Sequence, residues 1–155
     1  MNKKHTVSLD KIIKEFSLEI LNMPLTDEEI LISAIDVNRP GLQMAGYFKF
    51  FDRERIQIIG RTENGFLQHF TEEKAESRLK EFFEKKPAAV VICHDLQVSD
   101  VYRKLASKYE VPLFRTTSST SEFEAALIAF LNLNLAPRIT QHGVLVEVYG
   151  EGILL

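Results

Sequence analysis

The run AAVVICHD at residues 88–95 constrains the fold of this chain more than any other stretch. Its apolar residues are continuous rather than alternating, which predicts a strand buried on both faces in the centre of a parallel sheet. The following segment, 98–110, has the apolar spacing of a helix, and 111–116 is a second short strand-like run. This order predicts parallel neighbours joined by a right-handed crossover. We therefore expect an α/β fold whose sheet is at least partly parallel.

Signals for further elements lie on both sides of this unit. Ser8 and Thr71 are expected to be helix N-caps. Ser119 and Glu122 have capping-box spacing ahead of a long apolar helix that should end near Pro137. The expected architecture is a mixed, partly parallel sheet flanked by helices. Additional strands are predicted at residues 17–21, Ile30–Val37 and 55–60.

Length and composition narrow the class of protein. The 155 residues suit one domain with room for a small second piece, and no apolar run reaches the ~18 residues that cross a membrane. A net charge of −3 gives no reason to expect a nucleic-acid partner. The single cysteine, Cys93, excludes an internal disulfide and fits a reducing compartment. We expect a cytoplasmic protein that binds neither membrane nor nucleic acid.

The residues alone do not reveal catalytic machinery. Neither GxGxxG nor GxxxxGK[ST], the two common nucleotide-binding signatures, occurs in the sequence. No metal site is expected, because no pair of histidines or of histidine and cysteine has zinc-finger spacing. Taken by themselves, the residues leave the function undetermined. The four histidines are His5, His69, His94 and His142.

Polar residues at the ends of two predicted strands are candidates for binding a small ligand. His94 and Asp95 end the central strand, and ligands of open α/β sheets gather at such carboxyl ends. Arg115 ends the next strand, where hydroxyl groups and a helix N-terminus could receive an anion. The alternative is that all three residues only cap strands and turns. Cys93 is expected to be a small buried hydrophobic residue.

The pattern changes after residue 135. Two strands, Val144–Tyr149 and Gly152–Leu155, are predicted there with no helix to complete them. We therefore expect an N-terminal α/β domain over 1–135, followed over 136–155 by a linker and the first hairpin of another domain.

Three blocks of sequence carry a resemblance to a known family: NRPGLQMAGYF from residue 38, RIQIIGRTE from residue 55 and HGVLVEVYGEGILL from residue 142. Together they resemble the N-terminal portion of the bifunctional HPr kinase/phosphorylase, over nearly the whole chain. The family usually has serine and glutamate where Asn38 and Gln43 stand here, and aspartate at Glu147. In the family, the strand ending at Leu155 continues into the Walker A loop, so the chain looks like a fragment that stops just before it.

The resemblance implies a function for the parent protein. That enzyme uses ATP or pyrophosphate with Mg²⁺ to phosphorylate a serine of HPr, the phosphocarrier of the sugar phosphotransferase system. It also removes the phosphate with inorganic phosphate, and it assembles as a hexamer through its C-terminal kinase domains. The N-terminal domain resembles the uridine-nucleotide-binding domain of the Mur ligases. This chain is then expected to be a regulatory or assembly domain that carries no cofactor and is inactive alone, with the C-terminal kinase domain as its partner.

The resemblance also suggests two site residues. His142 matches the family's active-site histidine, and the alternative is an exposed linker histidine. Arg39, in the NRPG block, is the residue we expect to bind an anion, and the alternative is a tight packing corner around Gly41 and Gly46. Two other functions remain open: a free-standing module that binds a nucleotide sugar or phosphorylated metabolite, and a self-association module.

Overall fold

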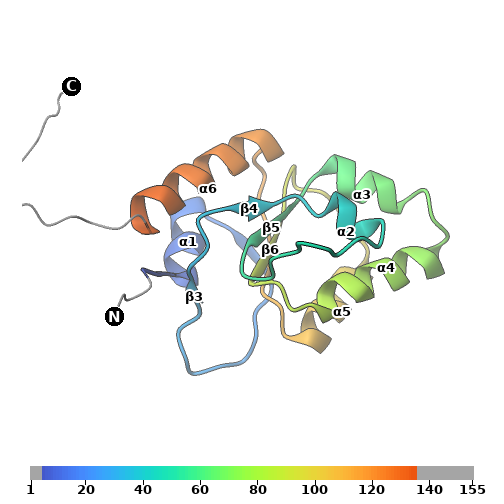
Figure 1. Ribbon diagram of the computed structural model, residues 1–155, viewed down its shortest axis with the longest axis horizontal. Helices are drawn as coiled ribbons and strands as arrows, with labels where there is room; N and C mark the ends of the chain where they lie inside the picture. The colour runs from blue at the N-terminus through green and yellow to red at the C-terminus, as the bar shows by residue number, and fades with distance from the viewer. Residues whose placement is uncertain (1–4, 136–155) are drawn as a thin grey trace, which may run out of the picture.

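The computed structural model describes residues 5–135. A five-stranded sheet in the order β2-β7-β6-β5-β4 forms the centre of the fold, and β1 and β3 form a separate two-stranded sheet (Figure 1). The strands are β1 (Val7–Ser8), β2 (Glu19–Asn22), β3 (Leu31–Ile32), β4 (Val37–Asn38), β5 (Ile56–Ile59), β6 (Ala89–Ile92) and β7 (Leu113–Arg115). The helices are α1 (Leu9–Phe16), α2 (Gly41–Met44), α3 (Arg61–Leu67), α4 (Glu72–Glu84), α5 (Asp100–Tyr109) and α6 (Thr120–Leu135).

The centre of the large sheet is parallel. β4 pairs with β5, β5 with β6 and β6 with β7, and all three pairs are parallel. β2, the edge strand next to β7, pairs with it in the antiparallel sense. β5 and β6 are buried along their whole length. The prediction of a mixed, partly parallel sheet flanked by helices is therefore confirmed, with the apolar run of β6 in the middle. The likeness to the Mur ligases stays a prediction.

Helices cover both faces of the sheet. Ile58 and Val91 belong to a core that includes residues of α1 and α6, and the intervening positions of the same strands face the other way. Ile59 and Val90 belong to a second core, built with side chains of α2 to α5. Figure 1 shows α1 and α6 on one side of the strands and α3, α4 and α5 on the other. The two-residue alternation of a strand explains why one apolar run serves both cores.

Three predicted helix caps are confirmed by hydrogen bonds. Ser8 Oγ accepts from the Lys11 amide at 3.1 Å, and Thr71 Oγ1 accepts from the Lys74 amide at 3.2 Å. At the start of α6, Ser119 Oγ accepts from the Glu122 amide at 3.2 Å and donates to the Glu122 carboxylate at 3.0 Å. Each side chain satisfies a helix donor that has no partner within the helix.

The prediction of one strand over Ile30–Val37 is wrong. Leu31–Ile32 pairs with β1 in the small sheet, whereas Val37–Asn38 pairs with β5 in the large one. The chain crosses between two sheets within this segment, so no single strand can span it. A further helix, α3, begins just after β5 and was not predicted from the sequence.

Within residues 5–135, no helix is both long and apolar enough to span a bilayer. The strands predicted at Val144–Tyr149 and Gly152–Leu155 lie outside the described residues.

Candidate functional site

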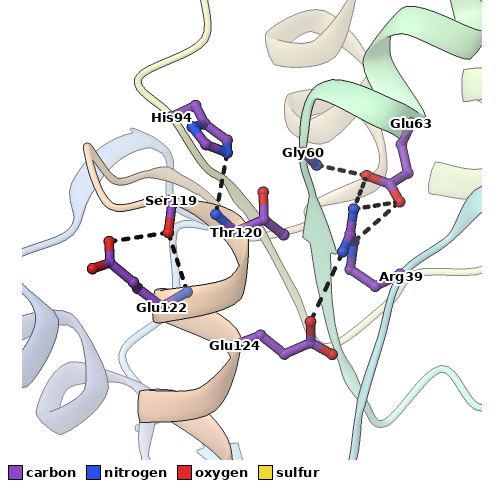
Figure 2. Close-up of polar contacts among 8 residues, drawn as sticks. All are labelled: Arg39, Gly60, Glu63, His94, Ser119, Thr120, Glu122 and Glu124. Carbon is purple, nitrogen blue, oxygen red and sulfur yellow. Dashed lines mark hydrogen bonds and ion pairs between the residues drawn. The ribbon is translucent and has the colours of Figure 1, made fainter.

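The carboxyl ends of the parallel strands bring together polar residues from four separate segments. Arg39 follows β4, Gly60 follows β5, His94 follows β6, and the loop after β7 leads to Thr120 at the start of α6. Figure 2 shows these residues around the N-terminal turn of α6. This is the edge at which open α/β sheets bind ligands, so it is the first place to look for a site.

Arg39 lies between two carboxylates (Figure 2). Its Nε and Nη2 donate to the two oxygens of Glu63, each at 3.0 Å, and Nη1 lies 3.8 Å from an oxygen of Glu124. Glu63 is buried, and its Oε1 also accepts from the Gly60 amide at 2.7 Å. A bidentate pair of this kind fixes the guanidinium in position, because both of its parallel N–H groups are engaged.

His94 connects β6 to α6 through a hydrogen bond. Its Nε2 accepts from the Thr120 amide at 3.3 Å, and its own amide donates to the carbonyl of Ser118 at 2.9 Å. An imidazole nitrogen that accepts is unprotonated, so the proton of a neutral His94 lies on Nδ1. Both His94 and Asp95 have positive φ angles, 60° and 51°, in a tight turn. These contacts match the capping alternative, and a role for either residue in ligand binding stays a prediction.

Arg115 is held by acidic groups on two elements. Its Nε and Nη2 donate to the two carboxylate oxygens of Glu19, each at 3.0 Å, and Nε lies 3.3 Å from Asp95 Oδ1. Nη1 donates to the Leu96 carbonyl at 3.1 Å. The hydrogen bond from Arg115 lowers the pKa of Glu19, and the same bond raises the pKa of Arg115. The side chain of Arg115 therefore connects the edge strand β2 to the loop after β6.

The structure places the predicted site residues in two groups. Arg39 and His94 lie around Thr120 and Gly60, whereas Asp95 and Arg115 contact each other beside β2. His142 lies outside the described residues. Among residues 5–135, no group of three or more His, Cys, Asp or Glu side chains could hold a metal ion.

Cys93 is fully buried behind this edge, as predicted. Burial raises its pKa to about 11, and the opposing effects of a hydrogen bond with Thr120 and the charge of Arg39 are smaller. Because only the thiolate is a strong nucleophile, the thiol is unreactive at neutral pH.

A buried amide network supports the loop that carries Arg39. Asn38 Nδ2 donates to Gln43 Oε1 at 3.0 Å and to Gln57 Oε1 at 2.7 Å. Gln43 Nε2 in turn donates to the carbonyl of Tyr47 at 3.2 Å. Asn38 and Gln43 are the two positions of this block that depart from the usual family residues, and the structure makes them hydrogen-bond partners.

Two clefts open near the same end of the sheet. The smaller, about 130 Å³, lies beside Arg115 and also contacts Arg103 and the α5 N-terminus at Ser99. The larger, about 420 Å³, lies between α3, α4 and α5. The sequence pointed to Arg115 but to no other lining residue of these clefts, because each cleft is lined by segments that are far apart in the chain.

The fold and this edge define a class: a mixed α/β domain with a parallel centre and an ion-paired carboxyl edge. The chain matches the family described as HPr Serine kinase N terminus over residues 7–131. It is 40% identical over 151 residues to the HPr kinase/phosphorylase of Lachnoclostridium phytofermentans, covering 97% of this chain and 49% of that protein. The HPr kinase/phosphorylase of Caldicellulosiruptor bescii is also 40% identical, over 96% of this chain and 48% of its own length. The chain belongs to this family of HPr kinase N-terminal domains.

The chain spans about half the length of the curated relatives it matches. A solved structure also has a similar fold: the CBS and DRTGG domains of the regulatory region of Clostridium perfringens pyrophosphatase. The TM-score is 0.56 with 20% sequence identity, over 80% of this chain and 46% of that one. At this identity the likeness concerns the fold alone.

Proposed function

We propose that this chain is the N-terminal regulatory or assembly domain of a bifunctional HPr kinase/phosphorylase. The parent enzyme phosphorylates a serine of HPr with ATP or pyrophosphate and Mg²⁺, and removes that phosphate with inorganic phosphate. The reactions belong to the half of the protein that follows this chain. In this proposal, the parent is a cytoplasmic hexamer, and the domain described here contacts its own C-terminal kinase domain.

The observation that carries the proposal is the way in which the chain aligns with its relatives. The two sequences are 40% identical, and the alignment covers 97% of this chain but only 49% of the Lachnoclostridium protein. The matching portion is therefore about half of a longer protein that is named for kinase and phosphorylase reactions. The ion-paired edge also supports a non-catalytic role, since Arg39 and Arg115 are both engaged by carboxylates.

The proposal is tested by supplying the two halves separately. The second half of the Lachnoclostridium relative is mixed with HPr, ATP and Mg²⁺, with and without this chain, and phosphate incorporation into HPr is measured. We expect no incorporation by this chain alone, incorporation by the second half, and a changed rate or assembly mass when both are present. An unrelated α/β domain of equal size serves as the control for a non-specific effect.

Two results would contradict the proposal. Phosphorylation of HPr by this chain alone would show that the chemistry lies within it. If the chain changes neither the rate nor the mass of the second half more than the control domain does, the regulatory or assembly role fails.

A second candidate function is binding of a phosphorylated metabolite, and the cleft beside Arg115 favours it. The charged side chains of its lining are two arginines, Arg103 and Arg115, and one carboxylate, Asp100, and a volume of about 130 Å³ suits a phosphate group. A ligand that binds the native state raises the melting temperature. Glucose 6-phosphate should therefore stabilise the native chain and not the Arg103→Gln variant, whereas equal effects on both would exclude this cleft.

A further inference from the structure

The larger cleft has the form of a small-molecule site. It lies between α3, α4 and α5, on the side of the sheet opposite α1 and α6 (Figure 1). Its volume of about 420 Å³ lies within the range of ligand pockets in proteins. Leu67, Leu79 and Tyr102 are the buried side chains of its lining. The half-buried Phe70, Ala75 and Val101 supply the apolar surface that a ligand can reach.

Two glutamates give the cleft its charge. Glu72 and Glu76 lie one turn apart on α4, and both line the cleft. Neither has an ion-pair partner among the residues that the structure describes. No lysine, arginine or histidine contributes to the lining, whose other polar members are amides, a serine hydroxyl and a tyrosine. Two carboxylates in a lining that contains no cationic side chain favour a positively charged occupant.

The ends of the neighbouring helices do not reverse this preference. The N-terminal end of α5, at Ser99, carries a partial positive charge, but Asp100 in its first turn offsets it. Leu67 and Gln68 place the negative C-terminal end of α3 beside the cleft. A helix-dipole role explains Glu72, which lies in the first turn of α4, but not Glu76, which lies one turn further on.

Aromatic rings add a second attraction for a cation. Phe70 and Tyr102 both line the cleft, and the face of an aromatic ring attracts positive charge. The ammonium of Lys74 already lies 6.0 Å from the centroid of the Phe70 ring. Lys74 is exposed and does not line the cleft, so water screens its charge, which offsets only part of the negative charge of the two glutamates.

We propose that this cleft binds a small organic cation, an amine with an apolar body. The ammonium lies between the carboxylates of Glu72 and Glu76, and the apolar body rests on Phe70, Ala75 and Val101. The ligand preference is opposite in charge to that of the arginine-lined cleft, so the two clefts do not compete for one compound.

The test uses three probes of similar size that differ in charge. Phenethylamine, 2-phenylethanol and phenylacetate are titrated calorimetrically into the 155-residue chain at low salt and neutral pH. We expect saturable binding of the amine, binding about tenfold weaker for the alcohol, and none for the carboxylate. Added salt should weaken amine binding, because it screens charges near the surface. Amide chemical shifts in NMR spectra should change at Leu67, Ala75 and Tyr102.

Paired variants locate the charge effect. Glu76→Gln should weaken amine binding about three- to fivefold and leave alcohol binding unchanged, as expected for a partly exposed charge pair. Glu73→Gln is the matched control, because it removes a neighbouring charge of the same helix that does not line the cleft. Ala75→Leu should fill the cleft with a good helix former and abolish binding of both probes. Circular dichroism and the melting temperature check that each variant folds.

The proposal is overturned by any of three outcomes. The first is no saturable amine binding at millimolar concentration. The second is equal affinity of the native chain for amine and alcohol. The third is the same loss of amine affinity in Glu73→Gln as in Glu76→Gln, since a general effect of net charge would then account for it. If Ala75→Leu fails to fold, the two glutamine variants still decide the question.

Discussion

Gly60 offers a sharp test of how the carboxyl edge is packed. A methyl group at this position would overlap Thr120 Oγ1 and would lie 3.3 Å from both Thr120 Cβ and Arg39 Nη2. The backbone at Gly60 is extended, with φ −117°, so alanine adopts it without strain. The cost of Gly60→Ala is therefore steric and arises where β5 approaches the first turn of α6.

The expected cost is the difference between two effects. Overpacking of a well-packed site costs about 1–3 kcal/mol. Replacing glycine where the backbone is compatible returns about 0.4–1 kcal/mol by restricting the unfolded chain. The mid-range values, about 2 and about 0.7 kcal/mol, predict that Gly60→Ala destabilises the native state by about 1.3 kcal/mol. Gly65, inside α3, has no atom within 4 Å of an added methyl group, so Gly65→Ala should stabilise by about 0.5–1 kcal/mol.

Urea unfolding of both variants and of the native chain measures these free energies. Thr120→Ala supplies the third arm, because it removes the oxygen that the new methyl group would overlap. In that background Gly60→Ala should cost less by about 1 kcal/mol, which a double-mutant cycle reports as coupling. A Gly60→Ala free energy within 0.5 kcal/mol of native, or an unchanged cost in the Thr120→Ala background, would refute the packing described here.

Three further predictions concern charged and ionisable groups. Glu63→Gln should lower the free energy of unfolding in urea by about 1–3 kcal/mol, because it removes a buried carboxylate that accepts hydrogen bonds from an arginine and an amide. Glu124 is more exposed, so Glu124→Gln should change that free energy by less than about 0.5 kcal/mol. Equal effects of the two substitutions would contradict the difference in burial. Burial raises the pKa of Cys93 from the ordinary 9.0 to about 11. Between pH 9 and pH 11 the thiol therefore ionises in the unfolded chain but keeps its proton in the folded one. The free energy of unfolding should fall as the pH rises through this range. In Cys93→Ala this fall in the free energy of unfolding should be smaller than in the native chain, by about 2 kcal/mol at most. The same dependence on pH in both proteins would count against the burial of the thiol. NMR titration should show a lower pKa for Glu19 in the native chain than in Arg115→Gln, since the hydrogen bond that lowers it is lost.

Local signals in the sequence predicted where helices start, but they did not predict which strands pair with one another. Ser8, Thr71 and Ser119 act on amides three residues away, so the cap and its target are visible in one short window. The stretch Ile30–Val37 looked like one strand because it is rich in apolar and β-branched residues. Only the pairing of its two ends, with β1 and with β5, shows that it belongs to two sheets.

The same distinction applies to the candidate site. Arg115 lies at the end of a strand, as predicted, and Arg39 directly follows β4, but their partners, Glu19 and Glu63, lie 96 and 24 residues away in the chain. No spacing rule connects such pairs, so the sequence could not show that both arginines are neutralised. One local signal was available. Glu63 stands three residues after Gly60, the position from which a glutamate reaches back to the amide that precedes a helix, and it marks the start of α3.

The burial of these partners decides which arginine can exchange its carboxylate for a ligand anion. An anion that bound Arg39 in place of Glu63 would leave the Glu63 carboxylate, whose side chain is 5% exposed, without its counter-charge. An unpaired buried charge lowers the stability of the folded state. Glu19, in contrast, has 51% side-chain exposure, so it can turn to water when it releases Arg115. Arg115 also borders the cleft that contains Arg103, whereas Arg39 borders neither cleft described here. Of the two arginines predicted to bind an anion, we therefore expect Arg115 to do so more readily, whereas the contacts of Arg39 join β4, α3 and α6.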